Sequence, residues 1–464
     1  MAKTKRIEKD TMGSVNVPAD AYYGAQTARA LANFPISGLQ SHPEMVRAVV
    51  LIKKAAALSN HALGRLEKRK SNAIVKACDE ILSGRYQDQF VVDVFQMGAG
   101  TSFHMNCNEV LANLAEEILG GKRGQYRSIH PNDDVNMGQS TNDVFPTAMK
   151  ISALFLLEDL MDALKSMENT FQAKAKEFDK VLKSGRTHLQ DAAPIRLGQE
   201  FQAYSKTLAG CRHFLEHAAR SLLELGIGGS AVGTGLNTPV GLAEHLINNL
   251  SRLTGLKVEG SKDLREAMQS MRPMAEVSAA LRNIALEMNR IANDLRLLSS
   301  GPKTGLAEIR LPAVAPGSSI MPGKVNPSML EMMNMVCFQV MGCDQTVSGA
   351  VQAGQLELNV MMPVIAFNVC LMIEILTNAL NQVKVLCIEG IEPNVERCQE
   401  YAKNSMGLAT ALSPYIGYSQ AAEIAKRSLV ERKSLIEIVL DEGLLTEEEV
   451  QKILDPKKMT EPNL

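Results

Sequence analysis

The positions of proline constrain the fold of this chain more than any other feature of its sequence, because an internal proline breaks or kinks an α-helix. Five long intervals of the sequence contain no proline, and each has room for a helix of several turns. These intervals lie between residues 146 and 194, 194 and 239, 273 and 302, 327 and 363, and 363 and 393. We therefore predict five long helices in the middle of the chain.

Apolar residues follow a helical repeat within these intervals. From Leu157 to Phe171 they recur at alternating steps of three and four residues, which places them on one stripe of a helix. A second series with the same steps runs between Pro273 and Gly301 and consists of Val277, Leu281, Ile284, Met288, Ile291, Leu295 and Leu298. Such stripes are typical of helices that pack nearly parallel, so the middle of the chain is predicted to be a helical bundle.

The chain is too long for a single core. With 464 residues, of which 45% are hydrophobic, it can bury several packed layers. We predict a mainly α fold with three domains. An N-terminal mixed, mainly helical domain spans 1–141, the long-helix bundle spans 142–394, and a small C-terminal helical domain spans 395–464.

The charge of the chain argues against two classes of partner. A formal net charge of −2 and a sequence pI near 6.5 provide no long-range field for nucleic acid or an anionic membrane. The first ten residues are densely charged and lack the apolar core of a secretory signal. The apolar stretch 358–373 is short for a membrane span and contains proline and asparagine, so it is predicted to be a buried helix. We expect a cytoplasmic protein that binds neither nucleic acid nor membrane.

The cysteine and histidine patterns indicate neither disulfides nor a metal centre. The eight cysteines form no C-x-x-C pair and lie mostly in apolar helical sequence, as reduced core residues do. His213, Glu216 and His217 match the H-x-x-E-H pattern of some zinc peptidases, but no clear third ligand follows, which favours solvated helix positions. The glycine-rich segment 226–235 lacks the ending of a nucleotide-binding loop, so we expect a bend or a substrate-side loop.

The segment 317–327, with the sequence GSSIMPGKVNP, has the composition of a mobile anion-binding loop. Gly317 and Gly323 allow successive N–H groups to converge on an anion, while two prolines restrict the neighbouring torsions. Its functional side chains are Ser318, Ser319, Lys324 and Asn326. Glycine, serine and proline alone would be compatible with an ordinary loop between helices. The added ammonium and amide groups favour a binding site.

Three further polar clusters have the composition expected of a dicarboxylate site. They are 98–102 (GAGTS), 139–143 (QSTND) and 185–191 (GRTHLQD). Each cluster taken alone is also typical of a helix cap or a turn, because Ser, Thr, Asn and Asp are preferred there. Their joint occurrence with the loop calls for a common explanation.

Together these segments resemble the signature regions of the aspartase/fumarase superfamily, and the resemblance extends from 18–24 (PADAYYG) to 439–446 (VLDEGLLT). Members of this superfamily eliminate ammonia, water, an amine or an amide from a succinyl-type substrate to give fumarate. The resemblance implies a three-domain fold around a long-helix bundle and a small dicarboxylate substrate. It also implies a homotetramer with active sites shared between subunits, and no organic cofactor.

The resemblance assigns a role to each candidate residue. Ser318 is the general base, and its alkoxide needs positive potential from Lys324 and from the N–H groups of the loop. Proton removal drives charge into the adjacent carboxylate, and fixed donors must stabilise this aci-carboxylate. The implied donors are Thr101, Ser140, Thr141 and Ser319. The implied ligands of the other carboxylate are Thr187, Lys324 and Asn326. The groups placed near the amino group are Asn142 and His188, with Glu331 as an ion partner of His188. The resemblance also implies that His188, like Ser318, is a catalytic residue.

Finer features favour one reaction of the superfamily, the reversible elimination of ammonia from L-aspartate. The sequences STND at 140–143 and AYYG at 21–24 resemble members that act on aspartate more than fumarate hydratases. Three residues depart from the usual pattern: Met97, His104 where Asn is usual, and Met362 where Glu is common. The alternatives are a class II fumarate hydratase, which would prefer malate, and a non-catalytic helical assembly protein.

Overall fold

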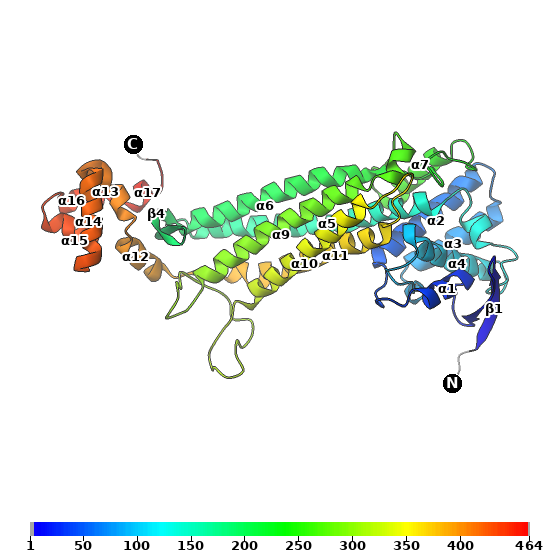
Figure 1. Ribbon diagram of the computed structural model, residues 1–464, viewed down its shortest axis with the longest axis horizontal. Coiled ribbons are helices and arrows are strands. Elements are labelled where there is room, and N and C mark those ends of the chain that lie inside the picture. The colour runs from blue at the N-terminus through cyan, green and yellow to red at the C-terminus, as the bar shows by residue number, and fades with distance from the viewer. Residues whose placement is uncertain (1–3, 463–464) are drawn as a thin grey trace. The chain divides into compact units, whose positions relative to one another are not determined.

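The structure is a computed structural model that describes residues 4–462 of the chain. It is mainly helical, and each of the five proline-poor intervals holds one long helix (Figure 1). These helices are α5 (Thr141–Glu177), α6 (Leu197–Arg220), α9 (Arg272–Leu298), α10 (Ser328–Gln352) and α11 (Met362–Leu386). The predicted fold class and the five long helices are therefore confirmed.

Three of the prolines that bound these intervals are themselves part of a long helix. Pro273 and Pro363 are the second residues of α9 and α11, where a helix has no N–H bond to lose. Pro146 lies deeper, in the second turn of α5. Because proline has no N–H, the carbonyl group of Asn142 receives no helical hydrogen bond from this position. The helix therefore begins before the proline that was expected to mark its start.

Residue contacts divide the chain into two compact units, which are described separately. Unit 1 consists of Met1–Met161, His213–Ala285 and Phe338–Thr377. Unit 2 consists of Asp162–Arg212, Leu286–Cys337 and Asn378–Leu464. Residues 1–3 of the charged N-terminal stretch, and 463–464, lie outside the described residues. The prediction of three consecutive domains is a division along the sequence, and it stays a prediction.

The helical seams predicted from the sequence are buried. Every apolar residue of the two predicted series lies in the core, and most have no exposed surface. Polar bonds join the same helices within each unit. In unit 1, the Ser278 hydroxyl on α9 donates to Asp344 Oδ1 on α10 at 2.6 Å. In unit 2, Asn334 Nδ2 on α10 donates to Asn289 Oδ1 on α9 at 2.7 Å. The long helices are thus packed against one another through apolar stripes with few polar links.

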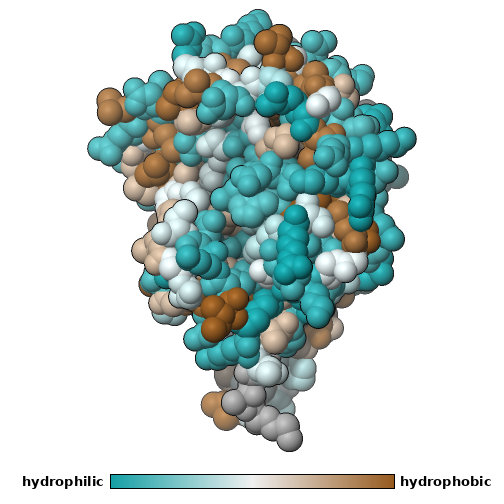
Figure 2. Space-filling view, turned by 90° about the vertical axis from the view of Figure 1, so that its right-hand side faces the viewer, coloured by the Kyte–Doolittle hydropathy of each residue, from teal (hydrophilic) through white to brown (hydrophobic). Residues whose placement is uncertain are grey.

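Unit 1 contains the first helices of the chain and two small sheets. Strands β1 (Lys5–Asp10) and β2 (Gly13–Pro18) form an antiparallel hairpin, and β5 (Glu224–Leu225) pairs in parallel with β6 (Glu259–Gly260). The helices and helical turns are α1 (Ala25–Asn33), α2 (Pro43–Ala62), α3 (Lys68–Leu82), η1 (Gln87–Gln89), η2 (Gly98–Gly100), α4 (Thr101–Ile118), η3 (Pro131–Val135), η4 (Ser221–Leu223), α7 (Leu242–Thr254) and α8 (Leu264–Gln269). The face that carries the N-terminal elements is mostly hydrophilic, with small groups of hydrophobic residues between (Figure 2).

Helix α4 is the buried centre of the N-terminal elements. Every residue from Ser102 to Glu116 is buried, and buried polar groups require hydrogen-bond partners. The carboxylate of Glu109 meets this requirement by accepting N–H groups at the start of α1, at 2.8 to 3.1 Å. Because α1 has no acidic residue in its own first turn, Glu109 also supplies the negative charge that a helix N-terminus favours. These bonds hold α4, and with it Thr101, in a fixed position.

Helix α11 is both long and strongly apolar. The segment Met362–Gly390 is long and apolar enough to cross a membrane by length and composition, and in residues 4–462 no other helix meets that test. Core helices of soluble proteins meet it too. In unit 1, six residues of α11 have no exposed surface: Met362, Ile365, Val369, Met372, Ile373 and Leu376. The stretch 358–373 is therefore largely buried from Met362 onward, as the sequence predicted.

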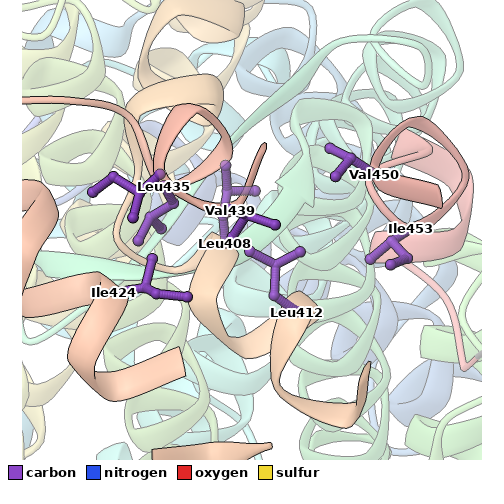
Figure 3. Close-up of a cluster of buried hydrophobic side chains, with 8 residues drawn as sticks. Leu408, Leu412, Ile424, Leu435, Val439, Val450 and Ile453 are labelled. Carbon is purple, nitrogen blue, oxygen red and sulfur yellow. The ribbon is translucent and has the colours of Figure 1, made fainter. Parts of the chain in front are cut away.

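Unit 2 contains two antiparallel strand pairs and the C-terminal helices. Strand β3 (Leu182–Thr187) pairs with β4 (Gln190–Arg196), and β7 (Ile309–Arg310) pairs with β8 (Glu392–Pro393). The C-terminal elements are η5 (Ile388–Gly390), α12 (Val395–Asn404), α13 (Leu408–Ile416), α14 (Tyr418–Glu431), α15 (Leu435–Asp441), α16 (Glu447–Ile453) and α17 (Pro456–Met459). Helices α13 to α16 enclose their own small core, formed by Leu408, Leu412, Ile424, Leu435, Ile438, Val439, Val450 and Ile453 (Figure 3).

The cysteines lie mostly in the core, as the sequence predicted, and the two histidines of the H-x-x-E-H pattern lie on the surface of α6. All eight cysteines are free thiols, and every one except the half-buried Cys211 is buried. His213 and His217 lie on α6 and both are exposed, as expected for solvated helix positions. Among residues 4–462, no group of three or more Cys, His, Asp or Glu side chains is placed to hold a metal ion.

Candidate functional site

The residues predicted to form the site fall into two groups, one in each unit. Unit 1 holds the clusters around Thr101 and around Ser140 to Asn142. Unit 2 holds the remaining candidates, which are Thr187, His188, Ser318, Ser319, Lys324, Asn326 and Glu331. Each of the four polar clusters lies at the end of a secondary-structure element or in a loop. Backbone N–H groups at such positions have no partner within a helix or strand and can bind a ligand.

The first cluster lies at the N-terminus of α4. Thr101 is the first residue of this helix, and Gly100 before it has a positive φ of 84°. A Cβ atom at Gly100 would overlap the ring of Phe145, so only glycine fits there. The N–H of Ala99 donates to the carbonyl oxygen of Val360 at 2.8 Å, which attaches the turn to the segment before α11. The turn is therefore fixed from two sides.

A cavity of about 570 Å³ opens beside this cluster. Thr101 and Ser102 line it, together with Arg29 on α1. Met97, one of the residues that depart from the superfamily pattern, also lines the cavity and is 50% exposed. The N-terminus of a helix carries partial positive charge and unpaired N–H groups, so this end of α4 favours an anionic ligand.

The second cluster lies at the N-terminus of another long helix, α5. Ser140 precedes the helix, and its Oγ accepts the N–H of Asn142 at 3.2 Å, while Asp143 Oδ1 accepts the Ser140 N–H at 2.9 Å. This is the helix cap that was the structural alternative for the cluster. In this cap the Ser140 hydroxyl only accepts a hydrogen bond, so its proton remains available to a ligand. Two helix N-termini in unit 1 thus carry three of the hydroxyl groups assigned to the aci-carboxylate, those of Thr101, Ser140 and Thr141.

The glycine-rich segment 226–235 packs against the start of α5. Asp143 is fully buried and accepts N–H groups of Gly228 and Ser230 at 3.1 and 3.0 Å. Burial raises the pKa of Asp143 to about 6, although these hydrogen bonds oppose the shift. Asn142 Nδ2 donates to the carbonyl oxygen of Ala231 at 2.8 Å, and its amide oxygen remains an acceptor for a ligand. The segment is therefore a loop beside the candidate site, one of the two alternatives that the sequence left open.

Two buried residues connect the first two clusters. His104 on α4 lies with its Nδ1 atom 2.7 Å from Thr141 Oγ1, and its Nε2 atom 2.6 Å from Nζ of Lys53 on α2. Both side chains are almost completely buried. The sequence analysis identified His104 only as a departure from the superfamily pattern, and it missed Lys53. The available signal was a lysine on the apolar face of α2, four residues after Val49 and three before Ala56, which are both buried.

The third cluster forms the tip of the β3–β4 hairpin. Thr187 pairs with Gln190, which leaves a two-residue turn of His188 and Leu189 with φ values of 55° and 58°. Two successive positive φ values are characteristic of a type I′ turn, where Asn and Gly are usual. A histidine in this conformation is strained, and strain of this kind is concentrated at functional positions.

A cluster of ion pairs joins strand β3 of the hairpin to the buried Glu308. Arg186 Nη1 donates to both carboxylate oxygens of Glu308 at 3.0 Å. Glu308 has no exposed surface and also pairs with Lys183 Nζ at 3.3 Å. Because a buried carboxylate without partners is costly, these contacts couple the position of the hairpin to the strand β7 that follows Glu308. Thr187 and His188 themselves are exposed at the tip.

The fourth cluster is a loop whose base is closed by its own hydrogen bonds. The Gly317 N–H donates to the carbonyl oxygen of Lys324 at 2.8 Å, and Asn326 Nδ2 donates to the carbonyl oxygen of Gly317 at 2.7 Å. Inside this closed base, Ser318 Oγ accepts the N–H groups of Ile320 and Met321 at 3.2 and 3.0 Å. Two N–H donors aimed at one hydroxyl oxygen stabilise negative charge on it.

The structure brings some candidates together and leaves others apart. It joins Thr141 to the helix of Thr101 through His104, and it joins Ser318 to Asn326 through Gly317. Glu331 lies in the first turn of α10, directly after the loop. Among residues 4–462, no hydrogen bond or ion pair joins His188 to Glu331.

Comparison with protein families gives two matches along the chain. Residues 13–342, more than half of the chain, match the family model described as Lyase. Residues 408–461 match the model described as Fumarase C C-terminus. The second match covers the helices that enclose the small core of Figure 3.

Curated relatives match over the full length of the chain. The chain is 49% identical over 462 residues to a protein named aspartate ammonia-lyase from Bacillus subtilis (strain 168), and the match covers 100% of this chain and 97% of that protein. It is 46% identical over 465 residues to a protein of the same name from Escherichia coli (strain K12), again covering 100% and 97%.

Solved structures match the fold equally well. A structure described as fumarate lyase:delta crystallin from Brucella melitensis bound to cobalt matches with a TM-score of 0.96 and 48% identity, over 99% of this chain and 100% of that one. The class II fumarase from Schistosoma mansoni matches with a TM-score of 0.96 and 38% identity, over the same shares.

Proposed function

The chain belongs to the aspartase/fumarase superfamily of lyases, and from this premise we propose that it eliminates ammonia reversibly from L-aspartate to give fumarate. Its full-length relatives named aspartate ammonia-lyase support this choice over the hydratase, since the solved fumarase is less similar in sequence. The reaction breaks a carbon–nitrogen bond after a proton leaves the carbon beside the side-chain carboxylate.

Ser318 is proposed as the general base, and the observation that carries this assignment is its paired N–H donors. An ordinary serine hydroxyl is hardly ionised at neutral pH, so an alkoxide requires local positive potential. The N–H groups of Ile320 and Met321 provide partial positive charge directly at Oγ. Lys324 adds a full positive charge on the same loop. Closure of the loop over substrate would exclude water and strengthen both contributions.

The hydroxyl groups of unit 1 are proposed to bind the carboxylate that gains charge. Removal of the proton gives an aci-carboxylate with a second negative charge, so donors fixed in advance lower the barrier. Thr101 and the pair Ser140–Thr141 lie at the N-termini of α4 and α5, where the helices add their own partial positive charge. Ser319, beside the base, is the fourth proposed donor.

The remaining candidates are proposed to hold the rest of the substrate. Lys324, Asn326 and Thr187 suit the carboxylate that does not change, since they offer an ammonium group, an amide and a hydroxyl. Asn142 has an amide oxygen that can accept from the amino group, while one proton of its NH₂ group is donated to Ala231. His188 is assigned to the same end of the substrate.

We propose that the active site is shared between subunits of a homotetramer. Family resemblance carries this proposal. It is compatible with the distribution of the candidates over two separate units, and with the exposed positions of Thr187 and His188. Under this arrangement Glu331 and His188 can pair between chains, although no bond joins them within residues 4–462.

The reaction can be tested directly with two substrates. Purified protein is incubated separately with L-aspartate and L-malate, fumarate is followed by ultraviolet absorbance, and ammonia is measured in parallel. We expect equal amounts of fumarate and ammonia from aspartate and no fumarate from malate. Fumarate from malate alone would move the assignment to a fumarate hydratase. Product from neither substrate would refute both activities.

The assignment of His188 is tested by a matched pair of variants at the hairpin turn. Both residues of the turn have positive φ, so His188→Gly and Leu189→Gly each relieve the same kind of backbone strain. We expect His188→Gly to lower kcat/KM on L-aspartate by roughly tenfold to a hundredfold, as for the loss of one hydrogen bond to a charged group of the substrate. Leu189→Gly should leave it unchanged, because that side chain is 70% exposed and apolar. Equal losses in both variants would assign the effect to the turn and not to the imidazole.

A further inference from the structure

A chain of hydrogen bonds runs from the interior of unit 1 to a proposed substrate ligand. It begins at Lys53 on α2, passes through both nitrogens of the His104 ring on α4, and ends at the hydroxyl of Thr141 on α5. The two contacts are short, at 2.6 and 2.7 Å. Lys53 has no exposed surface and His104 is 1% exposed, so water cannot replace either bond. The buried lysine has no role in the proposed function.

The contacts around Lys53 show which atoms accept hydrogen bonds from its ammonium group. Besides His104, its Nζ contacts the amide oxygens of Asn136 and Gln139, each at 2.9 Å. The NH₂ groups of these amides donate elsewhere, to the carbonyl oxygens of Gln139 and of Val135 and Met137, which fixes their oxygens toward the lysine. An ammonium group has three N–H donors and no acceptor. In residues 4–462, its three donors therefore meet three acceptors, and the third acceptor is Nε2 of His104.

The hydrogen bond from Lys53 decides which nitrogen of His104 donates to Thr141. If Nε2 accepts from Lys53, the neutral ring carries its proton on Nδ1, and Nδ1 then donates to Thr141 Oγ1. A threonine hydroxyl that accepts at its oxygen can turn its own proton outward. We propose that Lys53 and His104 are positioning residues that form this relay and hold the Thr141 hydroxyl as a hydrogen-bond donor toward the substrate carboxylate. This inference rests on the proposed function, because it takes Thr141 as a carboxylate ligand.

The relay also accounts for the residue that departs from the superfamily pattern. Asn, which is usual at position 104, carries an amide nitrogen at the same branch position as Nδ1 of histidine. It can therefore donate to Thr141 without reaching Lys53. The imidazole ring is longer, so it keeps this donor and adds a connection to the buried ammonium group. A donor toward Thr141 is the property that both residues share.

The groups that face Lys53 decide the charge on which the relay depends. Burial lowers the pKa of Lys53 to about 7, while Asp143 on α5 favours the charged form. The thiols of Cys107 on α4 and Cys78 on α3 face it too, and burial keeps both neutral by raising the pKa of Cys107 to about 12 and that of Cys78 well above its ordinary value. Burial, with the charge of Lys53, holds the pKa of His104 well below its ordinary value, so the ring is neutral. Below the pKa of Lys53, the ammonium group donates to Nε2 of His104, and Nδ1 donates to Thr141. Above that pKa the neutral amine can accept a proton from Nε2, so the direction of both hydrogen bonds reverses.

The first test is spectroscopic and independent of turnover. Protein labelled with ¹⁵N in its histidine rings is studied by nuclear magnetic resonance, and His104→Asn identifies the signals of His104. We expect a neutral ring with the proton on Nδ1 below pH 7, and a change toward the Nε2–H form as the pH is raised to about 9. In Lys53→Met this preference for Nδ1–H should be lost. An Nε2–H ring below pH 7 in the wild-type protein overturns the relay.

The second test compares two replacements of His104 by kcat/KM on L-aspartate. His104→Leu and His104→Asn both remove the contact with Lys53, but only Asn keeps a donor toward Thr141. We expect His104→Leu to lower kcat/KM about tenfold or more, as for the loss of one fixed donor, and His104→Asn to retain most of it. Circular dichroism confirms that each variant is folded. If the two variants behave alike, the relay is refuted. If the wild-type protein releases no ammonia from aspartate, the proposed function fails, and the ring proton still decides the relay.

Discussion

Replacing Ser318 with alanine is expected to lower kcat on L-aspartate at least about a thousandfold, because it removes the group proposed to accept the substrate proton. Ser318 is half-buried at the base of a loop whose residues 319–325 are exposed, and that base is closed by bonds of Gly317 and Asn326. The variant loses none of those bonds, so circular dichroism should remain that of the wild-type protein. Fumarate formation and ammonia release should fall together.

The neighbouring hydroxyl provides the control for this experiment. Ser319→Ala removes the same atoms one residue along the chain, but Ser319 is proposed only as a donor to the aci-carboxylate. We expect a loss of about tenfold to a hundredfold in kcat/KM, smaller than that of Ser318→Ala, because three other proposed donors remain. Turnover close to that of the wild-type protein in Ser318→Ala would rule out Ser318 as the base, and a larger loss in Ser319→Ala would transfer the role to its neighbour.

Replacing Gly100 with alanine is expected to destabilise the protein by roughly 2–5 kcal/mol. About 1–2 kcal/mol of this arises from a non-glycine residue at a φ of 84°, and a further 1–3 kcal/mol from forcing a methyl group into the ring of Phe145. The midpoint of urea unfolding, measured at fixed protein concentration, reports the change. Because Thr101 follows directly, the fraction of variant that still folds should also have a weakened aci-carboxylate site.

Gly120 is the matched control for this prediction, since it has a φ of 88° and no atom within 4 Å of the position that a methyl group would take. Gly120→Ala should show only the backbone cost, about 1–2 kcal/mol. Phe145→Leu added to Gly100→Ala should recover part of the lost stability, because the two residues are in contact and their effects are not additive. Equal losses in Gly100→Ala and Gly120→Ala would contradict the close approach of Phe145.

The sequence predicted the framework because the framework depends on local properties. Proline placement and apolar steps of three and four act within one helix, and α5, α6, α9, α10 and α11 lie where those patterns placed them. The predicted seams are buried for the same reason. The position of Pro146 was interpreted less well, because the helix begins before it, at Thr141, where Ser140 caps the first turn.

The polar clusters were identified by composition, but their local geometry was not. Hydroxyl and amide residues next to glycine mark both a helix cap and a binding site, and Ser140 is in fact a cap that keeps a free proton. The strained turn at His188 gave no sequence signal, since neither His188 nor Leu189 is a residue that a type I′ turn prefers. Strain of this kind is visible only when the paired strands define the turn.

The sequence by itself determined the helical fold, the identity of the four polar clusters and the superfamily resemblance, because each of these is encoded in residues that lie close together along the chain. Only the tertiary structure decided which side chains meet. Lys53 and His104 are separated by 51 positions, and His104 and Thr141 by 37. Contacts over such distances depend on how α2, α4 and α5 pack, and no local pattern specifies that packing. The physical reason is burial: a lysine or histidine in the core must find partners, and those partners come from whichever helices close around it.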